Sequence, residues 1–179
     1  MHNDIESILF TKEDIEARID ELAAEINRDY KGMSPDVVGI LRGSFIFMSD
    51  LVRKFDFPCR LDFMKISSYG SGTASSGNVK INQDIGMSIE GKDLLIIEDI
   101  VDSGNSMNSL FKLLATRNPR SVRLCTLLDK PDRRQVPVHI DYTGFSIPDA
   151  FVVGYGLDYA DMYRSLPYIG ILKPEIYSK

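Results

Sequence analysis

The chain has 179 residues, of which 44% are hydrophobic and 26% are charged, and its formal net charge is −5 at pH 7. These values are ordinary for a globular protein, so we expect a single domain over residues 1–179 that buries a sizeable core. The negative charge argues against a nucleic-acid backbone as the main partner, which requires a broad basic surface, and it favours a small-molecule site.

The cysteines and the hydropathy pattern indicate the compartment. Cys59 and Cys125 lie in apolar, strand-like runs and fit reduced core thiols better than a disulfide framework. No apolar run approaches the ~18 residues of a membrane span, and the first ten residues are acidic rather than basic and apolar. We therefore expect a soluble, cytoplasmic protein.

The first predicted unit is a helix followed by a strand. Thr11 to Asp14 can cap a helix whose apolar residues recur on one face, at Ile15, Ile19, Leu22 and Ile26. A buried strand is then predicted over residues 37–41. The next helix, predicted from Phe45 to Phe55, follows Arg42-Gly43-Ser44 directly, so this turn offers an anion site at a helix N-terminus. A plain strand-to-helix turn is the alternative.

A hairpin with an unusual connection is predicted next. Strands are expected at 60–66 and, antiparallel to it, at 79–84. Residues 67–78 between them read SSYGSGTASSGN and are rich in glycine and serine. A flexible linker would separate domains, whereas strands of one domain flank this segment, so we favour a mobile lid.

The most informative stretch is LLIIEDIVDSGNSM, residues 94–107. Leu94 to Ile97 predict a strand buried on both faces, as in the middle of a parallel sheet. Glu98, Asp99 and Asp102 follow, and Ser103 to Ser106 then provide small and hydroxyl-bearing residues before a helix predicted from Met107 to Thr116. Backbone N–H groups and the helix dipole favour an anion there, at the strand end where open α/β sheets bind ligands. A solvated turn with Ser106 as an ordinary N-cap is the alternative.

The remaining segments predict further strands. One is expected from Val122 to Leu128, and Lys130 follows, held extended by Pro131. A polar loop covers 132–137, a short strand or turn 142–145, and an apolar run 151–154. Residues 169–172 are expected to close the sheet.

EDIVDSGNSM resembles the phosphoribosyl-pyrophosphate motif of the type I phosphoribosyltransferases, in which two acids precede a loop that holds the ribose 5-phosphate. Other segments resemble the hypoxanthine-guanine phosphoribosyltransferases in the order of that family. They are Leu41 to Ser44 (pyrophosphate loop), Ser68-Tyr69 (flexible loop), Leu128 to Lys130 (purine-contacting lysine) and Phe151 to Tyr159 (base stacking). Ser106 stands where many members carry threonine, and Asn105 where some carry lysine, departures that affect only fine substrate preference.

The resemblance implies an α/β fold with a mainly parallel central sheet flanked by helices, a small hood and an antiparallel flexible-loop hairpin. It also implies purine salvage, namely transfer of the phosphoribosyl group to hypoxanthine or guanine with Mg²⁺, by a homodimer or homotetramer. Mg²⁺ prefers oxygen ligands, which the carboxylates of this site would supply.

The resemblance also assigns roles to residues of this chain. Asp102 is implied as the general base or acid at purine N7. The ribose and its phosphate would be held by Glu98, Asp99, Asp102, Ser103, Gly104, Asn105 and Ser106. Pyrophosphate would meet Arg42, Gly43 and Arg164, with Ser68 and Tyr69 closing over it. The purine would contact Lys130, Phe151, Val152 and Asp158. Metal-shell contacts are implied for Glu98, Asp99 and Asp158.

Two other functions are compatible with the same motifs. One is a phosphoribosyltransferase for another base, such as xanthine or a pyrimidine, although Lys130 favours a 6-oxopurine because an ammonium group can only donate hydrogen bonds. The other is a regulator that senses phosphoribosyl pyrophosphate and binds nucleic acid, but the sequence shows neither a DNA-binding domain nor a broad basic face.

Overall fold

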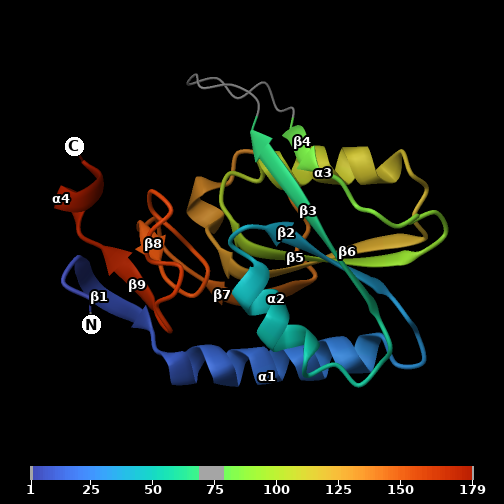
Figure 1. The fold of residues 1–179 in the computed structure, drawn as a ribbon, viewed down its shortest axis with the longest axis horizontal. Coiled ribbons are helices and arrows are strands. Elements are labelled where there is room, and N and C mark those ends of the chain that lie inside the picture. The colour runs from blue at the N-terminus through green and yellow to red at the C-terminus, as the bar shows by residue number, and fades with distance from the viewer. Residues whose placement is uncertain (1, 69–78, 179) are drawn as a thin grey trace.

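The structure, a computed structural model, describes residues 2–68 and 79–178, which form two β-sheets and the helices that cover them (Figure 1). The six-stranded sheet has the order β4-β3-β2-β5-β6-β7 and the three-stranded sheet the order β1-β9-β8. The strands are β1 (Ile5–Phe10), β2 (Asp36–Leu41), β3 (Arg60–Ser68), β4 (Val79–Gln83), β5 (Asp93–Val101), β6 (Ser121–Asp129), β7 (Tyr142–Ser146), β8 (Val152–Val153) and β9 (Ile169–Leu172). The α-helices are α1 (Lys12–Asp29), α2 (Phe45–Val52), α3 (Asn105–Ala115) and α4 (Pro174–Tyr177), and a 3₁₀ turn covers Pro131–Arg133.

The larger sheet is mainly parallel, and the first six residues of its strand β5 are buried on both faces, as predicted. β2 pairs in parallel with β3 and β5, β5 with β6, and β6 with β7, whereas β4 is antiparallel to β3. Helices α1 and α2 cover one face and α3 the other (Figure 1). Leu94, Leu95, Ile96 and Ile97 of β5 are fully buried because alternate side chains enter the two apolar layers. The α/β fold class is confirmed.

The helix predicted after Thr11 is confirmed together with its cap. Thr11 accepts a hydrogen bond from the Asp14 N–H, and the Asp14 carboxylate accepts one from the Thr11 N–H, which is a capping box. Ile15, Ile19 and Leu22 lie on the buried face. None of the helices within residues 2–68 and 79–178 is long and apolar enough to cross a membrane.

β2 and β5 are neighbours in the sheet, but the connections that leave them run to opposite sides, and this arrangement positions the site. From β2 the chain passes through α2 to β3 on one side, and from β5 it passes through α3 to β6 on the other. The loops that leave these two neighbouring strands therefore diverge at the carboxyl edge of the sheet and leave a crevice between them, which is where ligands bind in open α/β sheets.

The prediction that residues 169–172 close the central sheet is wrong. β9 is instead the middle strand of the small sheet, antiparallel to β1 on one side and β8 on the other. β1 has no clear alternation of apolar and polar residues, with only Ile5 buried, so no local pattern indicated a strand that would pair with β9. The small sheet and α4 lie together at one end of the molecule (Figure 1).

The antiparallel hairpin of β3 and β4 is confirmed, with Ile66 opposite Ile81. β3 extends through Ser68, two residues beyond the predicted strand. Tyr69 and the rest of the predicted lid up to residue 78 lie outside the described residues.

Candidate active site

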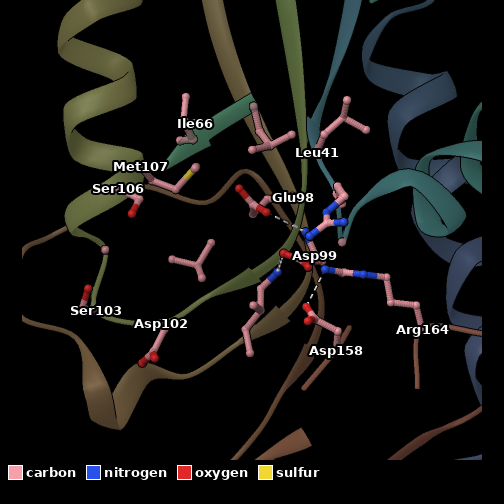
Figure 2. Close-up of a pocket in the computed structure, with 16 residues that line it drawn as sticks. Leu41, Ile66, Glu98, Asp99, Asp102, Ser103, Ser106, Met107, Asp158 and Arg164 are labelled. Atoms are coloured by element: carbon pink, nitrogen blue, oxygen red, sulfur yellow. Dashed lines mark hydrogen bonds and ion pairs between the residues drawn. The ribbon is translucent and has the colours of Figure 1, made fainter. Parts of the chain in front are cut away.

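A cavity of about 320 Å³ opens at the carboxyl ends of β2 and β5 (Figure 2). Arg42 and Gly43 of the loop after β2 line one part of it, and the loop after β5 lines another through Asp102, Ser103 and Gly104. The two anion loops predicted from sequence therefore face one shared cavity. Ser106, Asp158 and Arg164 also line it.

Glu98 and Asp99 both line this cavity but differ in their surroundings, as expected for successive residues of a strand. Glu98 is buried, whereas Asp99 is half-buried and its N–H donates to Glu98 Oε1 at 3.1 Å. Burial, and then the negative charge of Asp99, raise the pKa of Glu98 well above its ordinary range. A cation or hydrogen-bond donors from a ligand would relieve this repulsion.

The loop after β5 turns into α3 through Gly104, which has a left-handed backbone with φ of 84°. A side chain there would place its Cβ 2.7 Å from the Val136 carbonyl oxygen, so the turn requires glycine. α3 begins at Asn105, two residues before the predicted start, and Ser106 is inside the helix rather than at the N-cap. The first helical N–H groups, which have no partner within a helix, therefore lie beside the cavity.

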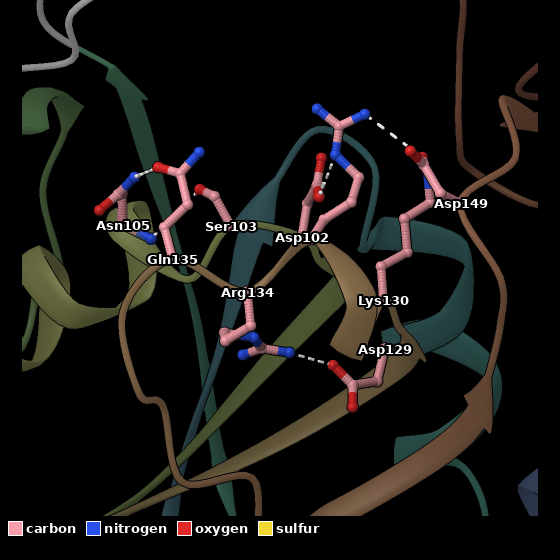
Figure 3. A network of polar contacts seen from close by, with 9 residues as sticks. Asp102, Ser103, Asn105, Asp129, Lys130, Arg134, Gln135 and Asp149 are labelled. Carbon is pink, nitrogen blue, oxygen red and sulfur yellow. Dashed lines mark hydrogen bonds and ion pairs between the residues drawn. The ribbon is translucent and has the colours of Figure 1, made fainter.

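A second segment supports this loop from behind (Figure 3). The N–H groups of Gln135 and Val136 donate to the Ser103 carbonyl oxygen at 2.9 and 3.3 Å. The Asn105 side chain donates to Gln135 Oε1 at 2.8 Å and is not among the residues that line the cavity. Asn105 thus links the start of α3 to this second segment through its side chain.

The two arginines expected to meet pyrophosphate are both held by carboxylates. Arg164 lies 2.6 Å from Asp158 Oδ1 and donates to the Gly156 carbonyl oxygen at 2.6 Å. Arg42 forms an ion pair with Asp161, which is also 3.8 Å from Arg164. The guanidinium groups are therefore positioned before any anion arrives.

Three of the four residues expected to contact the purine lie outside the wall of this cavity, whereas the fourth, Asp158, lines it. Lys130 is 7% exposed, its N–H donates to the Val101 carbonyl oxygen at 2.9 Å, and it does not line the cavity. Because β5 and β6 are parallel neighbours, Lys130 and Asp102 follow adjacent strand ends, and Figure 3 shows both side chains above the sheet edge. Phe151 and Val152 are likewise outside the wall of this cavity.

Phe151 is already part of an aromatic stack. Its ring stacks on Tyr177 of α4 with a centroid distance of 4.7 Å and an interplanar angle of 18°, and it meets the edge of Tyr159 at 5.5 Å. Phe151 as a whole is 37% exposed, which leaves it accessible to a planar ligand. Val152 is buried and pairs with Ile171 in the small sheet.

Several residues at the site were not predicted from sequence. Asp161 pairs with Arg42, Tyr177 supports Phe151, and Arg133 and Asp149 link the purine-reading groups. These contacts join segments that are distant in sequence or lie in irregular loops, so no local pattern indicates them. Only the position of Asp161, close to Asp158 and Arg164 in one acidic and aromatic loop, was a signal.

Comparison with known proteins agrees with this geometry. The family model described as the phosphoribosyl transferase domain matches residues 7–160. The chain belongs to the phosphoribosyl transferase family. The matched range contains both anion loops and the acids between them, and it includes every residue that lines the cavity of Figure 2 except Arg164.

Individual phosphoribosyl transferases match over the full chain. A hypoxanthine-guanine phosphoribosyltransferase of Staphylococcus aureus is 52% identical over 178 residues, which cover 99% of this chain and 99% of that protein. The crystal structure of a hypoxanthine phosphoribosyltransferase from Staphylococcus aureus superposes with a TM-score of 0.97 at 52% identity, covering 100% of this chain and 97% of that one.

A third relative has a different extent. The bifunctional protein TilS/HprT of Listeria innocua is 54% identical over 179 residues, which are 100% of this chain but 28% of that protein. The chain thus spans little more than a quarter of this bifunctional relative and nearly all of the Staphylococcus aureus protein.

Proposed function

We propose that the protein transfers the 5-phosphoribosyl group from phosphoribosyl pyrophosphate to N9 of hypoxanthine or guanine, giving IMP or GMP and pyrophosphate in purine salvage. The observation that carries this proposal is the single cavity in which two anion loops flank Glu98 and Asp99. A donor with phosphate at one end of a ribose and pyrophosphate at the other needs two such loops with hydrogen-bond acceptors for the sugar hydroxyls between them. The full-length likeness to a hypoxanthine-guanine phosphoribosyltransferase supports the choice of acceptor.

The donor is held by backbone and charge. The N–H groups at the start of α3, with Ser103 and Ser106, bind the 5-phosphate, while Glu98 and Asp99 accept hydrogen bonds from the ribose hydroxyls. Pyrophosphate binds at Gly43 and between Arg42 and Arg164. It pairs with these two arginines, which in the free protein pair with Asp161 and Asp158. We assign Ser68 and Tyr69 to the pyrophosphate as well, although Tyr69 lies outside the described residues.

The base is read by groups that follow β5 and β6. N9 of the purine attacks C1 of the ribose, the bond from C1 to the pyrophosphate oxygen breaks, and Asp102 accepts the proton that the purine loses at N7. Lys130 donates to O6, and Phe151 stacks on the ring. The backbone of Val152 and Asp158 reads the remaining edge.

Mg²⁺ fits this site as an ion brought in by the substrate. Among residues 2–68 and 79–178 no group of three or more histidine, cysteine or acidic side chains could hold a metal ion without further ligands. Mg²⁺ usually keeps waters and substrate phosphates and takes only one or two carboxylates, which Glu98 and Asp99 supply, and Asp158 would approach a second ion. When bound, the ion neutralises the negative charge of the pyrophosphate.

We also propose a homodimer or homotetramer of a single 179-residue domain in the cytoplasm. Large apolar side chains are exposed on α2 and β3, namely Phe45, Leu61 and Phe63, and association of two copies would cover them. Free cysteines at 59 and 125 fit a reducing compartment. Sedimentation of the purified chain tests the association.

A steady-state assay of the purified protein with Mg²⁺, phosphoribosyl pyrophosphate and four separate bases tests the main proposal. Hypoxanthine and guanine should each give a nucleotide and an equal amount of pyrophosphate, with xanthine and adenine much poorer. Efficient transfer to adenine, or transfer to none of the four bases, would refute it.

A further inference from the structure

One guanidinium group touches both sides of the predicted purine site. Arg133 Nε lies 2.9 Å from Asp102 Oδ1, and Arg133 Nη1 donates to Asp149 Oδ1 at 3.3 Å. The same Asp149 oxygen is 3.8 Å from the Lys130 ammonium. The charges therefore alternate along a chain from Asp102 through Arg133 and Asp149 to Lys130. Figure 3 shows its two ends, Asp102 and Lys130, with Asp149 beside Lys130.

The backbone reinforces this arrangement. The Arg133 N–H donates to the Lys130 carbonyl oxygen at 3.2 Å, which closes the 3₁₀ turn that follows β6. The Lys130 N–H in turn donates to the Val101 carbonyl oxygen, next to Asp102. The turn that carries Arg133 is therefore fixed to the ends of both β5 and β6, and the Arg133 side chain has only a short distance to span to reach Asp102.

These ion pairs are poor candidates for a stabilising role. The Arg133 side chain is 50% exposed and that of Asp149 is 56% exposed. Pairs this exposed contribute about 0–1 kcal/mol to folding, because solvent screens them and ordering long side chains costs entropy. The fork of a guanidinium can nevertheless contact two carboxylates in fixed directions, which an ammonium group cannot.

We propose that Arg133 is a positioning residue that sets the separation of Asp102 and Lys130, the first directly and the second through Asp149. The inference rests on the proposed function, in which Asp102 meets N7 and Lys130 meets O6. These two purine atoms lie on one edge of the ring, so an acceptor and a donor at a fixed spacing recognise a 6-oxopurine. Neither Arg133 nor Asp149 needs to touch the base for this effect.

The test compares four variants with the wild type: Arg133→Met, Arg133→Lys, Asp149→Asn and the double variant Arg133→Met with Asp149→Asn. Arg117→Met is the control, because Arg117 also pairs with a carboxylate, donating to both oxygens of Asp84 at 2.8 Å, and does not line the cavity. For each protein, kcat and KM for hypoxanthine are measured together with the Kd of phosphoribosyl pyrophosphate by calorimetry. Thermal unfolding of each protein shows whether folding is affected.

Arg133→Met should lower kcat/KM for hypoxanthine about tenfold, because small misplacements of reacting groups are costly, while the donor Kd changes less than about twofold. Arg133→Lys should recover part of the loss, since an ammonium group can reach one carboxylate but not both. Asp149→Asn should lower kcat/KM by a smaller factor than Arg133→Met does. The double variant should have a kcat/KM less than about twofold below that of Arg133→Met, because both residues act through one chain of contacts. Arg117→Met should match the wild type.

Three results would overturn the inference: an unchanged kcat/KM in Arg133→Met, an equal loss in donor affinity, or losses that multiply fully in the double variant. A structural role would also overturn it. Arg133→Met would then have a Tm well below that of Arg117→Met and would regain activity when assayed at a lower temperature. The wild-type assay separates this inference from the proposed function. If the wild type transfers to no 6-oxopurine, the proposed function fails; if it does and Arg133→Met equals it, only the positioning role fails.

Discussion

The carboxylate of Asp99 packs directly against the Cα of Gly43: a Cβ added at position 43 would lie 1.4 Å from Asp99 Oδ2. The contact joins the end of β5 to the loop that leaves β2, and Gly43 in turn lies against Gly156, whose added Cβ would be 2.1 Å from the Gly43 carbonyl oxygen. Three segments of the cavity wall therefore meet with no room for a side chain. The spacing of the two anion loops depends on this packing.

Replacing Gly43 with alanine should therefore damage donor binding. Asp99 and the loop after β2 must separate to admit the methyl group, so we expect Gly43→Ala to weaken phosphoribosyl pyrophosphate binding about tenfold or more, the scale of overpacking costs of ~1–3 kcal/mol. Gly86→Ala is the control, because its Cβ would lie 3.6 Å from Asp62 Oδ2, an ordinary contact. Calorimetry gives both affinities. An unchanged affinity in Gly43→Ala would show that the two loops do not bind the donor together.

Glu98 should make the free protein less stable as pH rises. Its pKa is raised in the native state by burial and by the Asp99 charge, so the folded protein retains a proton that the unfolded chain has released. The free energy of unfolding therefore falls as pH rises from the unfolded pKa, near 4.5, through the higher native pKa. Asp84 and Asp93, whose pKa values are lowered chiefly by hydrogen bonds from Arg117 and Arg120, lose their contribution only at lower pH.

Urea unfolding at pH 5 and pH 8 measures this effect. Glu98→Gln should increase stability at pH 8 by on the order of 1 kcal/mol, because it removes an uncompensated buried charge, and should increase it less at pH 5. Glu90→Gln serves as the control, because Glu90 is exposed. A loss of stability at pH 8 in Glu98→Gln would mean that the Glu98 carboxylate is well accommodated in the free protein. Activity should fall in Glu98→Gln regardless, since a ribose contact is lost.

Lys130 should determine base selectivity. Its ammonium group can only donate, and purine O6 accepts, whereas adenine presents a donor at that position. Lys130→Ala should lower kcat/KM for hypoxanthine and guanine, with a loss of transition-state stabilisation of ~1–3 kcal/mol, because Lys130 is only 7% exposed and its contact with O6 is desolvated. The donor affinity should change little. Competition with adenine, measured in wild type and variant, should show a narrower preference. An unchanged preference would move discrimination to the segment from Phe151 to Asp158.

The central sheet could be predicted because its strands carry strong local signals. Leu94 to Ile97 form an apolar run too short for a helix and are buried on both faces, as the sequence indicated. The small sheet could not be predicted in the same way. β1 has a mixed pattern and β8 has only two residues, and both depend on pairing with β9 from a distant part of the chain.

The site was predictable where residues are consecutive and not where the fold brings them together. Asp102, Ser103 and Gly104 form one turn that leads directly into α3, so their place beside the cavity could be predicted from the apolar strand before them and the helix after them. Tyr177 stacks on Phe151, and Arg133 contacts Asp149, through tertiary packing alone. Asn105 donates a side-chain hydrogen bond to Gln135, a contact between segments 30 residues apart that no local pattern indicates.

The central claim is that Asp102 serves the base while the two loops hold the donor, and one comparison tests it most directly. In Asp102→Ala, kcat for IMP formation and the Kd of phosphoribosyl pyrophosphate are measured on the same preparation. The predicted result is a fall in kcat of ~10²-fold or more, with a donor Kd within about twofold of wild type, because the side chain transfers a proton and does not bind the phosphate. Loss of donor affinity in proportion to kcat would contradict this division of roles.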